Sequence, residues 1–212
     1  MADPILHGPD DSTYVRTARL VLAEKGVSYE LNHVDFLQGG MPAEQLARQP
    51  FAKVPAFEHD GFQLYECFAI ARYVDEAFRG PRLQPDEPHE RARMTQIFGI
   101  IDSYTYGPTV GQLVIQRLVV PMMGGEPDEA AITAALPAVE TAMSVLEGLL
   151  GQNSHLAGPD LSLADLHLAP IFAYFTGTPE SGPILENKPG LRRWWDAVSV
   201  RDSMTKTAPK FD

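Results

Sequence analysis

The sequence predicts an α/β domain over residues 1–78, a linker over residues 79–88 and an all-helical domain over residues 89–212. Short strand patterns alternate with helical patterns in the first of these segments, and the strand patterns stop at its end. The linker contains one glycine and three prolines among charged residues of both signs, a composition typical of a segment that ends regular structure.

The order of elements in the first domain is strand, helix, strand, helix, hairpin and helix. One parallel crossover followed by an antiparallel hairpin is the thioredoxin-like arrangement, so we expect a thioredoxin-like α/β fold. Ser12 or Thr13 can cap the first helix, and Gly26 is placed to end it. The expected segments before the hairpin are a strand over residues 4–7, a helix to about residue 25, a strand over 29–35, a loop with Gly39 and Gly40, and a helix over 43–48.

A hairpin and a helix close the first domain. Asp60-Gly61 is a two-residue turn signal between two apolar segments, and residues 63–65 form the return strand. Glu66 then opens a helix. The expected apolar face of this helix, at helical spacing, is Ile70, Tyr73, Val74 and Ala77.

The second domain shows helical patterns only. Residues 89–120 favour one helix with a bend near residues 107–108, and residues 124–127 break it. Ser162 and Asp165 form a capping box before a further apolar helix. Two more helices are expected, a long amphipathic one over residues 132–150 and a final one over residues 189–200.

Composition and charge exclude several classes of function. The net charge of −11 argues against nucleic-acid binding, which needs a basic surface, and against adhesion to anionic membranes. No unbroken apolar run approaches the roughly 20 residues of a membrane span, and the N-terminus lacks the basic and apolar regions of a signal peptide. The single cysteine allows no internal disulfide, which fits a cytoplasmic protein, and no cysteine and histidine spacing indicates a metal site.

The segment from Val54 to Cys67 is suited to hold an extended peptide. The residue before a proline is kept extended, so Val54 can offer its backbone N–H and C=O to a ligand, and the Val54-Pro55 bond can be cis. The helix start at Glu66-Cys67 presents free N–H groups and the positive end of a helix dipole, which suit a carboxylate. The Glu66 side chain suits an ammonium. These residues therefore indicate a ligand that has both a carboxylate and an ammonium group.

This succession of valine-proline, strand, turn, strand and helix start resembles the glutathione-binding half of the glutathione S-transferase family, with Cys67 where the family usually has serine. The run from Ser12 to Thr17 is similar to that of serine-type members, which include phi-like and many bacterial proteins. The capping box of Ser162 and Asp165 is also typical of the family. The resemblance implies glutathione as co-substrate, no metal, and addition of the glutathione thiolate to a small hydrophobic electrophile.

The resemblance implies that Ser12 is the catalytic residue that holds the thiolate. A free thiol has a pKa of about 8.5, and a hydroxyl donor at a helix N-terminus favours the ionised sulfur. Ser12 lies where both effects meet, after the first strand and at the start of the first helix. Two alternatives stay open: Ser12 is only a helix cap, or Thr13 or Tyr14 contacts the sulfur.

Further site residues also follow from the resemblance. Glu66 and Cys67 are expected to bind the γ-glutamyl end of glutathione, and Val54 with Pro55 its backbone. Lys53 is expected to pair with the glycine carboxylate. The alternatives are that Cys67 is a small buried apolar residue and that Lys53 is a solvated charge.

The chain departs from the family pattern before the second helix, where serine-type relatives often have His-Lys and this sequence has Gly40-Met41. The glycine carboxylate of glutathione then loses two ligands, for which Lys53 or Arg48 can substitute. This departure and Cys67 favour an alternative function, a glutathione-binding or fold-only protein with little catalysis. A glutathione-dependent isomerase or lyase on the same scaffold is a further alternative.

The resemblance also implies a homodimer. In related dimers an acidic residue reaches the glutathione amine in the other subunit, and Asp102 is expected to have this role; the alternative is an ordinary surface aspartate. Phe51 is a candidate intersubunit anchor. Several apolar residues can line the site of the electrophile or form ordinary helical core: Tyr104, Tyr106, Val110, Leu113, Met122 and Met123.

Overall fold

A computed structural model describes residues 3–35 and 40–210 of the chain. The chain forms two compact units: unit 1 comprises Met1–Gln84 with Val200–Asp212, and unit 2 comprises Pro85–Ser199. The C-terminal residues thus group with the α/β part of the chain, whereas the helical pattern predicted them as part of the helical domain. Helical periodicity does not reveal against which unit a helix packs.

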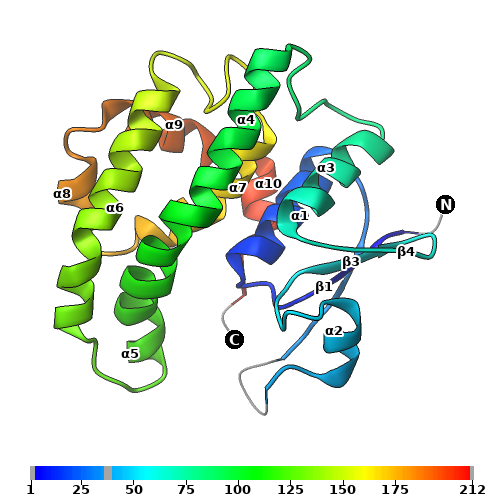
Figure 1. The fold of residues 1–212 in the computed structure, drawn as a ribbon, viewed down its shortest axis with the longest axis horizontal. Helices are drawn as coiled ribbons and strands as arrows, with labels where there is room; N and C mark the ends of the chain where they lie inside the picture. Colours follow the sequence, from blue (N-terminus) through cyan, green and yellow to red (C-terminus); the bar gives the residue numbers. More distant parts are fainter. Residues whose placement is uncertain (1–2, 36–39, 211–212) are drawn as a thin grey trace. The chain divides into compact units, whose positions relative to one another are not determined.

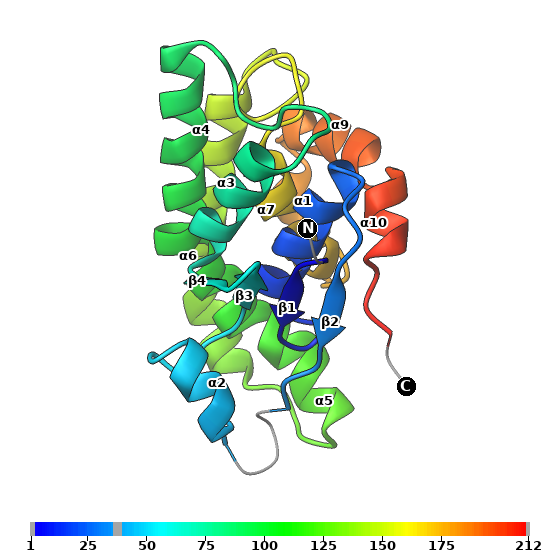
Figure 2. The same cartoon turned by 90° about the vertical axis from the view of Figure 1, so that its right-hand side faces the viewer.

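Unit 1 contains a four-stranded sheet with the order β2-β1-β3-β4, and Figure 2 shows these strands side by side. β1 and β2 are parallel, whereas β3 pairs antiparallel with β1 and with β4, so the thioredoxin-like arrangement is confirmed. The predicted loop residue Gly39 lies outside the described residues. The strands are β1 (Ile5–His7), β2 (Glu30–Asn32), β3 (Ala56–His59) and β4 (Phe62–Tyr65), and the helices are α1 (Thr13–Glu24), α2 (Ala43–Arg48), α3 (Cys67–Ala77) and α10 (Asp202–Lys206).

Local sequence signals of unit 1 act as predicted at most element ends. Ser12 is the N-cap of α1, and Gly26, with φ 68°, follows its C-cap. Asp60 and Gly61 have φ 48° and 79°, as a tight hairpin turn with two left-handed residues requires. β2 is shorter than the predicted strand over residues 29–35, because its partner β1 offers only three residues for pairing.

Helix α3 buries a different face from the predicted one at its C-terminal end. Ile70 and Val74 are fully buried as expected, but Ala77 is exposed. Asp75 is buried instead, because its Oδ1 lies 3.0 Å from the ammonium of Lys25, which directly follows α1. Hydrophobic spacing does not reveal a buried ion pair of this kind.

Unit 2 is helical, as predicted, and begins with a helical run over residues 88–122. The run starts as an α-helix and continues mostly as a π-helix, in which each N–H bonds to the fifth preceding residue. The change falls at Ile101, before the predicted bend at residues 107–108, and Pro108, which has no N–H to donate, lies within the π-helical part. Figure 1 shows α6 beside this run. The helices are α4 (Pro88–Ile100), η1 (Ile101–Thr105), η2 (Gly107–Val119), α5 (Val120–Met122), α6 (Glu129–Leu150), α7 (Leu163–Phe175), α8 (Ser181–Leu185) and α9 (Pro189–Val198).

The sequence did not predict α8, two of whose five residues, Gly182 and Pro183, are poor helix formers. Among the described residues α6 is the one helix long and apolar enough to cross a membrane. It packs against η2 and has the buried stripe of a core helix, formed by Ile132, Ala135, Val139, Ala142, Met143, Leu146 and Leu150.

The capping box at the start of α7 is confirmed and connects more elements than predicted. Asp165 is completely buried. Its Oδ2 accepts hydrogen bonds from the backbone N–H and the hydroxyl of Ser162, at 2.8 and 2.7 Å. Its Oδ1 accepts from the backbone N–H of Leu156 and from Nε1 of Trp194, both at 2.8 Å. One carboxylate therefore joins the loop before α7, α7 itself and α9.

Candidate functional site

Strand pairing brings the predicted ligand-binding segments to one end of the sheet in unit 1. His7, the last residue of β1, pairs with Ala56 at the start of β3, and Ala56 pairs with Tyr65 at the end of β4. These three residues form a row across the sheet. The residues next beyond the row are Gly8, Pro55 and Glu66.

Close packing joins these segments. A Cβ atom added at Gly8 would lie 2.4 Å from Cγ2 of Val15 in α1 and 3.2 Å from Cβ of Val54, so only glycine lets the end of β1 approach both. The Val54-Pro55 peptide bond is cis, as predicted. The turn that leads to Ser12 therefore lies beside the valine-proline segment.

Ser12 is half-buried at the N-terminus of α1, with its Oγ 3.4 Å from the backbone nitrogen of Val15. In this cap the oxygen accepts, so the hydroxyl hydrogen is still available to a second partner, and it has no acceptor among the described residues. Capping and thiolate binding are therefore compatible roles for one hydroxyl. Thr13, the second candidate, is buried.

Glu66 precedes α3 with φ 73° and ψ 117°, a conformation that residues other than glycine rarely adopt. Such strain costs about 1 to 3 kcal/mol and is concentrated at functional sites. Its exposed carboxylate does not cap α3 and has no partner in the part of the chain that the structure describes. It is therefore free to bind an ammonium.

Cys67 lies buried at the start of α3, and its Sγ donates to the backbone carbonyl of Tyr14 at 3.5 Å. This contact joins the start of α3 to the first turn of α1. Because the thiol is engaged within the protein, the side chain fits the alternative of a small buried residue. A direct role for Cys67 in ligand binding then rests on its backbone N–H.

Two glutamines that sequence reasoning missed hold the loop before Val54. Gln49 Oε1 accepts hydrogen bonds from the backbone N–H groups of Phe51 and Lys53, at 2.7 and 3.2 Å. Gln45 Nε2 donates to the carbonyl of Lys53 at 3.0 Å. Both glutamines are buried; Gln45 lies in α2, and Gln49 directly follows it as the C-cap.

The two basic side chains near the valine-proline segment differ in whether they are already paired. Arg48 Nε lies 2.7 Å from Oε1 of Glu58, and this hydrogen bond lowers the pKa of the Glu58 carboxyl. The exposed ammonium of Lys53 has no hydrogen-bond or ion-pair partner within the described ranges. Gly40 and Met41 offer no charged side chain.

Asp102 lies in η1 of unit 2, so its role beside residues of unit 1 stays a prediction. Its side chain is 39% exposed, and its Oδ1 lies 2.9 Å from Nε2 of His167 in α7. His167 is buried and stacks on Phe98, with ring centroids 3.7 Å apart. Burial lowers the pKa of His167 despite the nearby carboxylate. Sequence reasoning missed His167, because one histidine in an apolar helix does not reveal its partner.

We expect the free energy of unfolding to fall as the pH is lowered below about 6.5. The pKa of His7 is lowered by burial and then by Arg48, and burial lowers the pKa of His167. The unfolded chain therefore binds protons at these histidines before the folded chain does, so stability rises with pH across this window. Urea titrations between about pH 7.5 and 5.5 measure the slope.

A matched pair of histidine variants tests the origin of this slope. His167→Asn should make the dependence on pH shallower. His89, whose side chain is 99% exposed, provides the surface control, and His89→Asn should change the slope less than His167→Asn does. A wild-type stability that does not change over this range would contradict the expectation.

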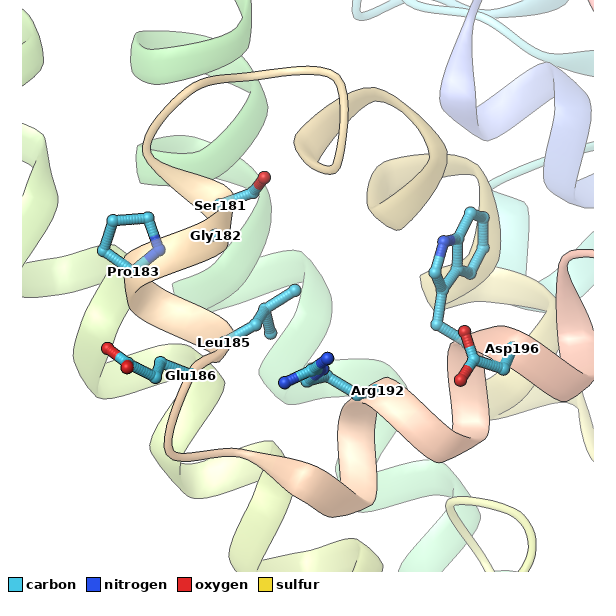
Figure 3. A pocket seen from close by; sticks show the side chains of 8 residues that line it. Ser181, Gly182, Pro183, Leu185, Glu186, Arg192 and Asp196 are labelled. Atoms are coloured by element: carbon cyan, nitrogen blue, oxygen red, sulfur yellow. The ribbon is translucent and has the colours of Figure 1, made fainter.

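The predicted site residues do not line the surface pocket shown in Figure 3. This pocket, of about 550 Å³, lies between α8 and α9 of unit 2, where Arg192 and Asp196 project beside it. Among the residues expected to line a site for the electrophile, Val110 and Leu113 are buried, which fits the alternative prediction of ordinary helical core. Tyr104, Met122 and Met123 are exposed.

Both parts of the chain match one family. The description "Glutathione S-transferase, N-terminal domain" fits residues 6–82, and "Glutathione S-transferase, C-terminal domain" fits residues 107–202. The chain is 30% identical over 208 residues to glutathione S-transferase F13 of Arabidopsis thaliana, an alignment that covers 96% of this chain and 94% of that protein. The chain therefore belongs to the glutathione S-transferase family.

Solved structures of the family share the fold. The apo structure of glutathione S-transferase III is similar with a TM-score of 0.88 and 30% identity, over 100% of this chain and 99% of that one. Glutathione S-transferase I bound with lactoylglutathione has a TM-score of 0.86 and 27% identity, over 98% and 99% of the two chains. The curated relative F13 is a plant protein, so the expectation of a bacterial serine-type member is not confirmed.

Proposed function

We propose that the chain binds glutathione at this end of the unit 1 sheet and conjugates its thiolate to small hydrophobic electrophiles. The observation that supports the proposal is that Gly8, Pro55 and Glu66 follow one row of the sheet, and that Gly8 packs against Val15 in the first turn of α1 and against Val54. The bond from Cys67 to the carbonyl of Tyr14 joins the start of α3 to the same turn, which follows Ser12. Lys53 binds the glycine carboxylate, Glu66 binds the γ-glutamyl ammonium, and the backbone of Val54 pairs with the peptide. The corresponding cellular role is detoxification in the cytoplasm.

Ser12 acts on the sulfur of bound glutathione. The thiol releases its proton to solvent, and the Ser12 hydroxyl donates a hydrogen bond to the thiolate at the N-terminus of α1, where the helix dipole also favours negative charge. The thiolate then attacks the electrophilic carbon. A carbon–sulfur bond forms, and the leaving group departs with the electron pair of the bond that breaks.

Retention on immobilised glutathione, followed by thiol-addition assays with several electrophiles, tests this proposal. We expect retention and conjugation faster than the uncatalysed reaction. Retention without conjugation would instead support a glutathione-binding protein with little catalysis, which Gly40-Met41 and the engaged Cys67 thiol favour. Turnover of a glutathione adduct without net conjugation would support an isomerase or lyase.

Glu66→Gln should weaken glutathione binding by about 1.5 to 3 kcal/mol, the range for a hydrogen bond to a charged group. The value of kcat should change little, because a carboxylate that faces an ammonium acts equally in the ground and transition states. Calorimetric titration with glutathione measures the loss. Glu76, which pairs with Arg72 on the exposed side of α3, is the matched control, and Glu76→Gln should leave Kd unchanged. A wild-type Kd in Glu66→Gln would place the γ-glutamyl end elsewhere.

We further propose that the chain forms a homodimer in which Phe51 is an anchor and Asp102 of a second copy approaches the bound ammonium. Phe51 is 67% exposed, and its ring meets Tyr65 edge-on with centroids 6.2 Å apart. Light scattering at micromolar concentration should give twice the chain mass of 23.3 kDa, and Phe51→Ser should shift the protein toward the monomer. A monomeric wild type would contradict the dimer and remove Asp102 from the site.

A further inference from the structure

The C-terminal segment, defined here as residues 201–210, is attached to α1 near both ends of that helix. At the end far from Ser12, the Glu24 carboxylate accepts two hydrogen bonds from Arg201, both at 2.8 Å, and one from the hydroxyl of Ser203. Figure 2 shows α10, in red, beside α1, in blue. Glu24 lies about 18 Å from Ser12 along the helix axis, at a rise of ~1.5 Å per residue.

Near Ser12 the attachment uses a buried arginine of α1. Arg16 Nη2 donates to the backbone carbonyl of Met204 at 3.1 Å. The backbone N–H of Arg16 in turn donates to the carbonyl of Ser12 at 2.8 Å. A buried guanidinium needs acceptors for its N–H groups, and the C-terminal segment supplies one of them. Arg16 therefore connects Met204 to the backbone of Ser12.

A second buried arginine, Arg19, connects the segment to the turn that precedes Ser12. Arg19 Nη1 lies 3.2 Å from the carbonyl of Thr207 and 3.3 Å from the carbonyl of Asp10. The backbone N–H of Lys210 donates to Oδ2 of Asp10 at 3.2 Å. The C-terminal segment is thus bonded to residues on both sides of Ser12.

We propose that the C-terminal segment is a positioning element that, through Arg16, Arg19 and Asp10, orients the Ser12 hydroxyl toward the glutathione sulfur. This inference rests on the proposed function of Ser12. The capping contact of Ser12 with Val15 is long, at 3.4 Å, so the direction of the hydroxyl depends on the backbone around it. A misplaced donor stabilises the thiolate less, because the hydrogen bond weakens steeply with misalignment.

A matched pair of arginine variants tests the proposal. Arg19→Met removes donors near Ser12, and Arg201→Met removes the same kind of side chain at the far end of α1. In folded Arg19→Met protein the pKa of the bound glutathione thiol should rise by about half a unit to one unit, and conjugation below that pKa should slow by about three- to tenfold. KM for glutathione should change by less than about twofold. Arg201→Met should show the wild-type thiol pKa.

Three results would overturn the proposal. The first is an unchanged thiol pKa in Arg19→Met. The second is an equal rise in Arg201→Met, which would show that the effect does not depend on the contacts near Ser12. If Arg19→Met does not fold, Arg19→Lys and Asp10→Ala provide the same test, with a smaller expected rise in the thiol pKa. The third contradicting result is an unchanged thiol pKa in both of these variants.

Ser12→Ala separates this inference from the function on which it rests. If Ser12→Ala leaves the thiol pKa unchanged, the proposed role of Ser12 is wrong and the inference fails with it. If Ser12→Ala raises the pKa and Arg19→Met does not, only the inference is wrong. A rise in both variants, with Arg201→Met unchanged, supports both claims.

Discussion

Ser12→Ala should lower the rate of glutathione conjugation at neutral pH by roughly ten- to a hundredfold. Its hydroxyl donates a hydrogen bond to a charged sulfur, and such bonds contribute about 1.5 to 3 kcal/mol. KM for glutathione should change little, because Lys53, Val54 and Glu66 still hold the peptide. Steady-state kinetics with a soluble electrophile, at several pH values, measure both quantities.

Two control variants separate this effect from the loss of a helix cap. Ser12→Thr keeps a hydroxyl and a cap and should retain most of the activity, and Thr13→Ala should behave like the wild type. Loss of a cap alone costs about 1 kcal/mol of stability and leaves the pH profile of the reaction unmoved. If Ser12→Ala shows only that loss, Ser12 is a cap and the contact shifts to Thr13 or Tyr14.

Asp165→Ala should lower the free energy of unfolding by about 4 kcal/mol or more. The substitution leaves donors of Leu156, Ser162 and Trp194 without an acceptor in the interior of unit 2. Each unsatisfied buried group costs about 1 to 3 kcal/mol. Denaturant unfolding monitored by circular dichroism measures the change as a lower midpoint at an unchanged m value.

A second aspartate cap provides the control for Asp165. Asp128 caps α6 at the surface, where its Oδ1 accepts from the backbone N–H groups of Ala130 and Ala131, both at 3.0 Å. Asp128→Ala should cost only about 1 kcal/mol, because water replaces an exposed cap. If Asp165→Ala and Asp128→Ala lower the free energy of unfolding equally, the buried hydrogen bonds of Asp165 contribute no more to stability than an exposed helix cap does.

Local signals were sufficient to predict the elements that carry the site. The Asp60-Gly61 turn, the Ser12 cap and the cis bond before Pro55 each depend on a few neighbouring residues, and the structure has all three. The buried face at the C-terminal end of α3 was not predicted, because it depends on an ion pair with a residue far away in the sequence. Asp75 is buried because Lys25 reaches it, and no spacing within α3 reveals that pair.

The order of motifs along the chain predicted the candidate site residues. It did not predict the residues of the same chain to which they are hydrogen-bonded. The side chain of Gln49 accepts a hydrogen bond from the backbone N–H of Lys53, four residues further along the chain. His167 meets Asp102 across 65 residues of sequence, and Arg16 meets Met204 across 188. Contacts of this range are set by tertiary packing, which the periodicity of one sequence does not contain.

Ultraviolet titration of the thiolate of bound glutathione, in wild-type and Ser12→Ala protein, tests most directly whether Ser12 stabilises the sulfur. The thiolate absorbs in the ultraviolet where the thiol does not, so its absorbance reports the ionised fraction. We expect the wild-type pKa to lie well below the free value of about 8.5 and the pKa in Ser12→Ala to be higher by about one to two units. Equal values in the two proteins would contradict this role of Ser12.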